Sequence, residues 1–330
     1  MREIKTCPIN IISELEHTLG ARLQGCAPLL SGADARACAF HVQAEDGREY
    51  FLKLRQAPFN PASLQAVTWL RDELGLSEVL APIRTGRSSG PEATFFWLLY
   101  PYIHGRDGFS RSLGREQWNR LGRCLRAMHD AELPPAVKQS LPKPDAIPGP
   151  EVLLRRLDDA GAYSGRDRIL LELAETCRQQ KPVFAKMPRE LPVPPQAGGK
   201  PNPVLCHGDI HAGNVLLADT GGLYLLDWDD LFLAPREQDL MFIGAGVGGR
   251  WNTPEETAYF YEGYGQTVVD PAAVTRCRLQ RIVADSLELL GLVQDTNSSR
   301  ADRQQNLRYF QSQFLPGNVT DMAGLTGNRV

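Results

Sequence analysis

Residues 205–228 read LCHGDIHAGNVLLADTGGLYLLDW and form the most informative segment of the chain. It contains a carboxylate at Asp209, an amide at Asn214 and a second carboxylate at Asp227, which follows an apolar run. Phosphoryl transfer from ATP needs a carboxylate that orients and deprotonates a hydroxyl, and Asn and Asp oxygens that bind Mg²⁺. We expect a strand over 204–206 before this loop and a β-hairpin that brings Asp227 back beside it.

Each of these residues also has an ordinary structural explanation. Asp209 alone could cap a backbone amide, and Asn214 and Asp227 are residue types common in turns and after strands. Their combination at this spacing favours a magnesium-dependent site. His207 and His211 flank Asp209, and we expect them to brace the loop, because no cysteine or histidine pattern indicates zinc. Asp239, in a helix that follows, is expected to brace the same loop.

Lys53 ends the apolar strand YFLKL at 50–54, where its charge could contact the α- and β-phosphates of a nucleotide. The alternative is a surface lysine on an edge strand. Upstream, the segment 31–36, SGADAR, could form a turn whose backbone N–H groups face the phosphates. An ordinary hairpin explains that segment almost equally well.

Composition excludes several classes of protein. The chain has 330 residues, a formal net charge of −3 and a pI near 6.1, which argues against a dedicated nucleic-acid binder. Its seven cysteines contain no CxxC pair, which indicates reduced core residues. No apolar run approaches the roughly 20 residues of a membrane span, and the N-terminus lacks a signal-peptide pattern. We expect a soluble cytoplasmic protein, a monomer or a homodimer.

The pattern along the chain predicts an α+β fold. Helical spacing over 10–23 is followed by candidate strands at 36–43, 49–54, 78–83 and 94–99, and Asn60-Pro61 begins a helix. After residue 101 the chain reads as mainly helical, with helices at 115–129, from Pro254, at 272–293 and at 302–314. The proline-rich stretches 134–150 and 182–203 are expected to be surface connections.

Acidic residues are concentrated around the motif. Residues 200–270 contain eleven acidic and three basic side chains. Carboxylates in excess of the metal ligands favour a cationic, amine-bearing substrate, although a solvated acidic face is the plainer explanation.

The motifs HGDIHAGNVLL and LLDWD resemble those of the aminoglycoside phosphotransferase and choline kinase superfamily. The resemblance runs the full length and is strongest to the phosphotransferases that act on spectinomycin, the aminoglycoside 9-phosphotransferase type. Two segments carry that narrower likeness, APREQDLMFIGAGVGGRWN at 234–252 and YFYEGYG at 259–265.

The resemblance implies a two-lobed protein-kinase-like fold, with an antiparallel-sheet nucleotide-binding lobe at 1–99, a hinge at 100–103 and a helical lobe at 104–330. It implies ATP and Mg²⁺ as cofactors, Asp209 as the catalytic base, and Asn214 and Asp227 as metal ligands. It implies nucleotide contacts from Lys53, Ser31, Gly32, Arg36 and the backbone at Tyr100 and Tyr102. As substrate residues we expect Asp229, Asp230, Trp251, Glu262 and Tyr264.

Two departures from the kinase pattern concern nucleotide binding. Kinases pair the strand lysine with an acid on the following helix, yet no Asp or Glu occurs from 54 to 71. Gln65 could substitute, or Lys53 could be held mainly by the nucleotide. The phosphate turn has Ser31 where relatives often have a second glycine, and Arg36 where a small polar residue is usual.

The function expected from these residues is phosphorylation of a hydroxyl of an aminocyclitol or aminoglycoside antibiotic, foremost spectinomycin, which would confer resistance. Choline, macrolide, homoserine and hydroxyurea kinases share the central motif and remain alternatives. A nucleotide-binding pseudoenzyme is a further alternative, because Lys53 lacks its helix acid. A protein kinase is disfavoured, since only seven residues separate Asp229 from Glu237 and leave no room for a peptide platform.

Overall fold

The chain folds into two compact units. The computed structural model describes residues 7–29, 37–56, 60–89, 94–143, 146–188, 203–229 and 231–326. The first unit, which we call the sheet unit, comprises Met1–Gly105, Leu133–Leu141 and Ala218–Asp230. The second, the helical unit, comprises Arg106–Glu132, Pro142–Leu217 and Leu231–Val330. The sheet unit therefore includes two segments that lie beyond the boundary predicted near residue 100.

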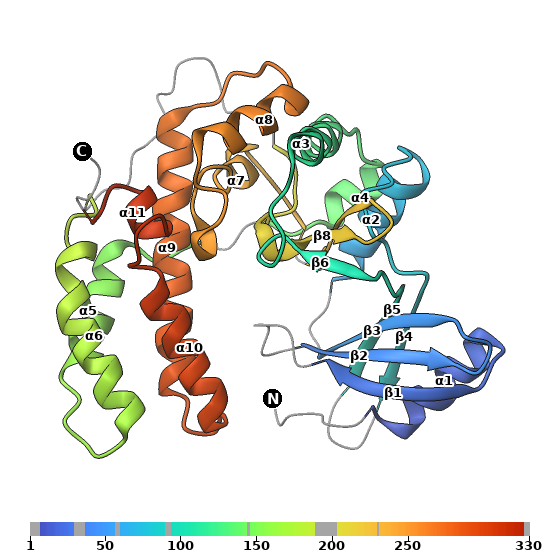
Figure 1. The fold of residues 1–330 in the computed structure, drawn as a ribbon, viewed down its shortest axis with the longest axis horizontal. Helices are drawn as coiled ribbons and strands as arrows, with labels where there is room; N and C mark the ends of the chain where they lie inside the picture. Colours follow the sequence, from blue (N-terminus) through green and yellow to red (C-terminus); the bar gives the residue numbers. More distant parts are fainter. Residues whose placement is uncertain are drawn as a thin grey trace. The chain divides into compact units, whose positions relative to one another are not determined.

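An antiparallel sheet of five strands forms the centre of the sheet unit (Figure 1). In spatial order these are β1 (Leu23–Leu29), β2 (Ala37–Ala44), β3 (Glu49–Gln56), β5 (Thr94–Pro101) and β4 (Arg84–Ser89). Side chains alternate between the two faces of a strand. Leu52 and Leu54 of β3 are buried in a cluster with Ile11 and Leu15 of helix α1 (Ile9–Leu19), so Lys53 points to the opposite face.

The boundaries of several predicted elements change in the sheet unit. The first helix stops at Leu19 because Gly20 adopts φ +63°, a left-handed helix end, and β1 follows where the helix was expected to continue. The predicted strand at 78–83 is wrong: Val79 forms only an isolated bridge with Leu225, and β4 begins at Arg84. Helix α2 (Pro61–Asp72) begins as predicted, with the Asn60 side chain accepting the Ala62 N–H at 3.0 Å.

The two additional segments of the sheet unit pack locally. Helix α4 (Pro135–Ser140) lies in the proline-rich stretch that was expected to be a connection, and Asn60 donates to the Ser140 carbonyl at 3.2 Å. The Leu225 N–H donates to the Glu78 carbonyl at 2.7 Å. These contacts explain why 133–141 and 218–230 group with the sheet.

The helical unit contains six longer helices within the described ranges. They are α3 (Arg115–His129), α5 (Pro150–Gly161), α6 (Arg168–Phe184), α8 (Pro254–Tyr264), α9 (Pro271–Gln294) and α10 (Arg300–Ser312). The core cluster joins α5, α6, α9 and α10 (Figure 1) through buried residues that include Leu157, Leu173, Val283 and Leu307. None of the helices that the structure describes is long and apolar enough to cross a membrane.

Shorter elements complete the chain. Strands β7 (Val204–Cys206) and β10 (Phe232–Ala234) pair in antiparallel register, and β6 (Gly105–Asp107), β8 (Val215–Ala218) and β9 (Leu223–Leu225) follow the order β6-β8-β9. The short helices are η1 (Ala212–Asn214), α7 (Glu237–Leu240), η2 (Val247–Gly249) and α11 (Val319–Met322). The strand predicted over 204–206 and the hairpin predicted before Asp227 are both confirmed.

Helices α3 and α8 pack with their backbones in direct contact. A Cβ atom on Gly263 would lie 1.9 Å from the Asn119 carbonyl oxygen, and one on Gly122 would lie 2.3 Å from the Phe260 carbonyl oxygen. The predicted face of α3 is confirmed, since Trp118, Leu121, Leu125 and Met128 are all buried. The two glycines therefore allow α8 to lie close to α3.

We predict opposite effects for two glycine-to-alanine substitutions. Gly263→Ala should lower the free energy of unfolding by about 1–3 kcal/mol, because the methyl group has no space and α8 must move away. Gly291→Ala in α9 should raise it by roughly 0.5–1 kcal/mol, since a Cβ there meets nothing within 4 Å and alanine favours the helix. Urea denaturation followed by circular dichroism measures both; equal effects would contradict the close packing of α3 and α8.

Candidate active site

The loop that carries Asp209 begins with a turn that requires glycine. Gly208 has φ +83°, a conformation that costs little only for glycine. A Cβ atom at this position would also lie 2.4 Å from the Phe232 ring of β10. The tight turn sends the chain out of β7 and presents Asp209 directly after it.

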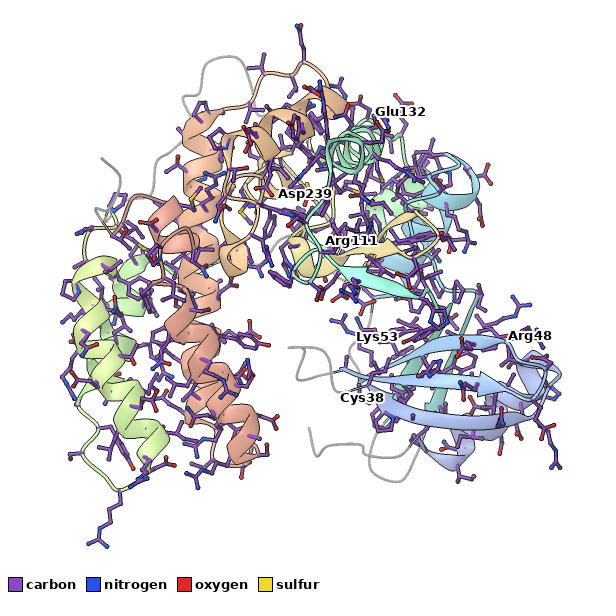
Figure 2. All side chains as sticks on the ribbon, in the orientation of Figure 1. Cys38, Arg48, Lys53, Arg111, Glu132 and Asp239 are labelled. Atoms are coloured by element: carbon purple, nitrogen blue, oxygen red, sulfur yellow. The ribbon has the colours of Figure 1, made fainter. Side chains whose placement is uncertain are left out.

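Asp239 stabilises this turn through hydrogen bonds, as expected. Its two carboxylate oxygens accept the backbone N–H groups of His207, at 2.9 Å, and of Gly208, at 2.7 Å. The side chain is completely buried, and His129 contacts it through Nε2 at 3.0 Å. A buried carboxylate with three partners is a stable anchor, because each of its oxygens is hydrogen-bonded. Figure 2 shows Asp239 within the helical unit.

Asp209 is contacted at both carboxylate oxygens, by an ion pair without hydrogen-bond geometry at Oδ1 and by a hydrogen bond at Oδ2. The Arg281 Nη1 atom lies 3.0 Å from Oδ1, while Asn214 Nδ2 donates to Oδ2 at 3.1 Å and to the Asp209 carbonyl at 2.8 Å. His211 Nε2 lies 3.4 Å from Oδ2. The side chain is still 37% exposed, so a hydroxyl group can reach it.

The environment keeps Asp209 ionised. Burial by itself would raise the pKa of the Asp209 carboxyl, but the Arg281 guanidinium and the His211 ring outweigh it and hold the pKa below its usual range. His211 Nδ1 accepts the Gly213 N–H at 3.0 Å, which places the ring proton on Nε2, facing Asp209. The structural role expected for His211 is thus confirmed.

Asn214 donates to Asp209 through its amide nitrogen only. Within the described ranges no hydrogen bond reaches its amide oxygen, which is the atom that a hard cation would bind. The residue ends η1, whose first turn is capped by His211. The local fold thus fixes the orientation of the amide.

Lys53 has the acidic partners that the sequence left open, although they do not come from helix α2. Its Nζ atom lies 2.7 Å from Asp227 Oδ1 and forms a close ion pair with Asp229. Asp229 is also paired with Arg55 Nη1 at 2.5 Å. Burial alone would lower the pKa of Lys53, but Asp229 and Asp227 outweigh it and raise the pKa. Figure 2 shows Lys53 on the sheet of its unit.

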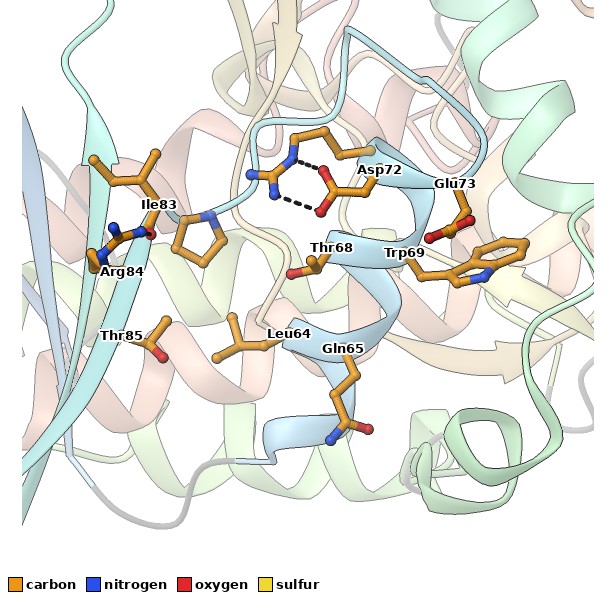
Figure 3. A pocket seen from close by; sticks show the side chains of 11 residues that line it. Leu64, Gln65, Thr68, Trp69, Asp72, Glu73, Ile83, Arg84 and Thr85 are labelled. Carbon is orange, nitrogen blue, oxygen red and sulfur yellow. Dashed lines mark hydrogen bonds and ion pairs between the residues drawn. The ribbon is translucent and has the colours of Figure 1, made fainter.

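Gln65 does not replace the missing helix acid. It is exposed on α2 and lines a cavity with Leu64, Thr68 and Thr85 (Figure 3). Among the described hydrogen bonds, none joins it to Lys53. The acidic partners of Lys53 come from the segment after β9. Lys53 and Arg55 share one face of β3, and both side chains contact that segment.

Asp227 stands in a strained backbone conformation. Its φ is +62°, which is uncommon for any residue other than glycine, although asparagine and aspartate adopt it more often than the rest. The next residue, Trp228, is buried and donates its ring N–H to the Leu225 carbonyl at 2.8 Å, which fixes the turn. Such conformations are concentrated at functional sites, and Trp251, with φ +57°, is the other non-glycine example within the described ranges.

The hinge segment is bound into the sheet. Tyr100 is buried and lies opposite Phe51, and burial raises the pKa of its phenol well above the usual value. The Tyr102 N–H donates to the Glu49 carbonyl at 3.1 Å, and its ring lies against His41 at 4.2 Å. The Tyr102 N–H is therefore not available to adenine in this conformation. Any contact of adenine with this segment must use other backbone groups.

Three of the residues expected to contact substrate have protein partners in this structure. Trp251 and Tyr264 are core residues: the Trp251 ring packs on Trp118 at 4.9 Å, and the Tyr264 hydroxyl contacts His129 Nδ1 at 2.7 Å. Glu262 pairs with Arg115 through two contacts of 2.9 Å that join α8 to α3.

Trp251 and Tyr264 are therefore buried in the core, whereas Glu262 forms a partly exposed ion pair with Arg115. Asp229, with a side chain only 1% exposed, belongs to the ion-pair network of Lys53. Of the other predicted site residues, Ser31, Gly32, Arg36 and Asp230 lie outside the described residues.

Two features of this region could not be read from the sequence. Arg281 lies on α9, far along the chain from the motif, and its spacing to Asp285 is common on solvated helices. His129, Cys206 and Asp239 lie close enough to suggest a metal centre. Asp239 already binds two backbone amides and His129, and Cys206 Sγ contacts the Ala234 carbonyl, so these groups satisfy one another.

The ion pairs of Lys53 predict that neutralising Asp229 and neutralising Asp227 lower the free energy of unfolding by different amounts. Asp229→Asn should lower the free energy of unfolding by about 3–5 kcal/mol, because it leaves two largely buried cations without their shared carboxylate. Asp227→Asn, whose side chain is 42% exposed, should change it by less than about 1 kcal/mol. Urea denaturation at neutral pH compares the two; equal losses would contradict the division between a structural and an exposed acid.

Comparison with known proteins agrees with this geometry. The sequence profile described as the phosphotransferase enzyme family (APH) matches residues 25–277. The structure is similar to spectinomycin phosphotransferase APH(9)-Ia in complex with ADP and spectinomycin, with 30% sequence identity, a TM-score of 0.79, and coverage of 98% of this chain and 99% of that one. The AMP-bound complex of APH(9)-Ia matches at 29% identity and a TM-score of 0.72, with coverage of 96% and 97%.

More distant relatives share the fold. Amicoumacin kinase hAmiN, in complex with AMP-PNP, Ca²⁺ and Ami, is 15% identical with a TM-score of 0.53, and the coverage is 94% of this chain and 92% of that one. No curated protein matches the sequence. The two-lobed kinase-like fold expected from the motifs is confirmed, and the chain belongs to the phosphotransferase enzyme family.

Proposed function

We propose that this small-molecule phosphotransferase transfers the γ-phosphoryl group of MgATP to a hydroxyl of spectinomycin or a related aminocyclitol and thereby confers resistance. The single observation that carries the reaction type is the state of Asp209. Arg281, His211 and Asn214 contact its two oxygens, its pKa is held below the usual range, and its side chain is still 37% exposed, which suits a base for a substrate hydroxyl.

Asp209 is the base in this proposal. It accepts a hydrogen bond from the substrate hydroxyl, aims the oxygen at the phosphorus and takes the proton late, because the transition state of phosphoryl transfer is loose. The low pKa suits this role, since the carboxylate is fully ionised at neutral pH and needs only to orient the hydroxyl until the bond to phosphorus forms.

Asp227 and Asn214 are the residues that would hold Mg²⁺, which neutralises charge on the nucleotide phosphates. Both offer oxygen donors of the kind this ion prefers. Lys53 would contact the α- and β-phosphates. Its present partner Asp227 is partly exposed, so the exchange of a carboxylate for a phosphate at Lys53 requires no change in the buried pair with Asp229.

Support for the substrate comes from the relative rather than from individual residues. APH(9)-Ia, described in complex with ADP and spectinomycin, is similar over essentially the whole of both chains. The acidic excess at 200–270 remains compatible with a cationic acceptor. Choline, macrolide, homoserine and hydroxyurea are the alternative acceptors, and the geometry of Asp209 argues against a pseudoenzyme.

The first experiment is phosphoryl transfer from γ-labelled ATP and Mg²⁺ to a panel of spectinomycin, streptomycin, kanamycin, a macrolide, choline and homoserine. We expect labelled product from spectinomycin, and NMR would identify the phosphorylated hydroxyl. Product from another acceptor alone would contradict the substrate but retain the reaction. Binding of MgATP without any product would favour a pseudoenzyme.

Asp209→Ala should reduce the rate of transfer by about 10²–10⁴-fold, because the hydroxyl loses its base and its orientation. The affinity for MgATP should stay within several-fold, as measured by calorimetry. Asp219→Ala is the matched control, since Asp219 is an exposed acid in the turn after β8. A transfer rate of Asp209→Ala close to that of the control would contradict the assignment of the base.

A further inference from the structure

Arg281 connects a distant helix to the proposed base. It extends from α9, and its Nη1 atom lies 3.0 Å from Asp209 Oδ1 and 3.5 Å from the Gly208 carbonyl oxygen. Its Nε atom donates to Asp285 Oδ2 at 2.8 Å, one turn further along α9. The guanidinium also lies over the Phe242 ring, 5.3 Å from its centre.

We propose that Arg281 is a positioning residue for phosphoryl transfer, which holds the Asp209 carboxylate in the orientation that receives the substrate hydroxyl, and that Asp285 and Phe242 hold Arg281. This inference rests on the proposed role of Asp209 as the base. It concerns a residue that lies outside the HGDIHAGN motif.

The contacts at the two oxygens of Asp209 are unequal. Oδ2 is held by Asn214 and His211, whereas the contact at Oδ1 comes from Arg281 alone within the described ranges. Because an aspartate rotates about two single bonds, loss of the Oδ1 contact frees the carboxylate to turn about the Asn214 side. A shift of about 1 Å in a reacting group can cost about 10²-fold in rate, so this contact matters to the reaction.

The geometry of Arg281 suits an arginine in particular. The planar guanidinium presents Nη1 to Asp209 and Nε to Asp285 at the same time, while its face lies on Phe242. A lysine ammonium in this position carries the charge but is a single group, so it cannot face Asp209 and Asp285 with two separate nitrogens. Burial by itself would lower the pKa of Arg281, but Asp285 and Asp209 outweigh it and raise the pKa.

Charge also makes a contribution. A catalytic carboxylate must work beside the negative phosphates of the nucleotide, and a nearby cation reduces that repulsion. Arg281 is balanced by two carboxylates, Asp209 and Asp285, so the group as a whole retains a negative charge that is compatible with a cationic acceptor.

The test compares Arg281→Ala, Arg281→Lys and Asp285→Asn with Arg278→Ala. Arg278 is the matched control: it lies on the same helix and donates to the carbonyls of Met241 and Ile243. All four proteins are checked by circular dichroism, and kcat and KM are measured with MgATP and spectinomycin.

We expect Arg281→Ala to lower kcat by about 10–100-fold, with KM for MgATP changed less than about threefold. Arg281→Lys should recover part of kcat, Asp285→Asn should show a smaller loss, and Arg278→Ala should keep the wild-type kcat. A kcat within twofold of the wild type for Arg281→Ala, or an equal loss in Arg278→Ala, would overturn the positioning role while leaving the proposed function intact.

A crystal structure of Arg281→Ala provides a readout that does not depend on activity. We expect the Asp209 carboxylate to turn or to occupy more than one orientation, and an unchanged single orientation would overturn the inference. If the wild-type enzyme phosphorylates no acceptor, the proposed function fails, and this structural comparison still decides whether Arg281 positions Asp209. If Arg281→Ala does not fold, Arg281→Lys serves for both measurements.

Discussion

The loop that carries Asp209 depends on one interaction: the buried Asp239 carboxylate accepts the backbone N–H groups of His207 and Gly208. A turn with a left-handed glycine exposes its amide groups, and amides that are removed from water must find acceptors. Asp239 supplies both acceptors, and His129 with Tyr264 completes the chain of contacts from α3 and α8. The close packing of these two helices, made possible by Gly122 and Gly263, is therefore connected through Asp239 to the turn that precedes Asp209.

Charge compensation governs the proposed catalytic residues in both units. In the helical unit, Arg281 offsets the cost of partly burying Asp209 and keeps it ionised. In the sheet unit, Asp229 lies between Lys53 and Arg55 with almost no exposure to solvent. In each case a charge that water would otherwise stabilise is held by a fixed partner, so the proposed reactive groups need little reorganisation when ligands bind.

The two acids of the LLDWD motif, Asp227 and Asp229, differ in their exposure and in their contacts. Asp229 is buried and pairs with Lys53, so the lysine has an acidic partner although no Asp or Glu occurs from 54 to 71. Asp227 is exposed and strained, and its contact with Lys53 is the one that a nucleotide and its metal ion would exchange under the proposed mechanism. Asp229, two residues after the proposed metal ligand and expected to contact substrate, forms an ion pair with Lys53. Sequence spacing could not separate these roles, because alternate residues after a strand can turn either way.

Motif spacing and apolar periodicity are local properties of the chain, and they were enough to predict the reaction class, the α+β character and the helix faces. The sequence also predicted Asp239 as a brace and the helix starts at Asn60-Pro61 and Pro254, since caps and turns depend on neighbouring residues. Only the tertiary structure decided that Arg281 meets Asp209, that Asp229 pairs with Lys53, and that Trp251 and Tyr264 are buried. These contacts join residues far apart in the chain, and their formation depends on how α9, β3 and α8 pack, which no local pattern encodes.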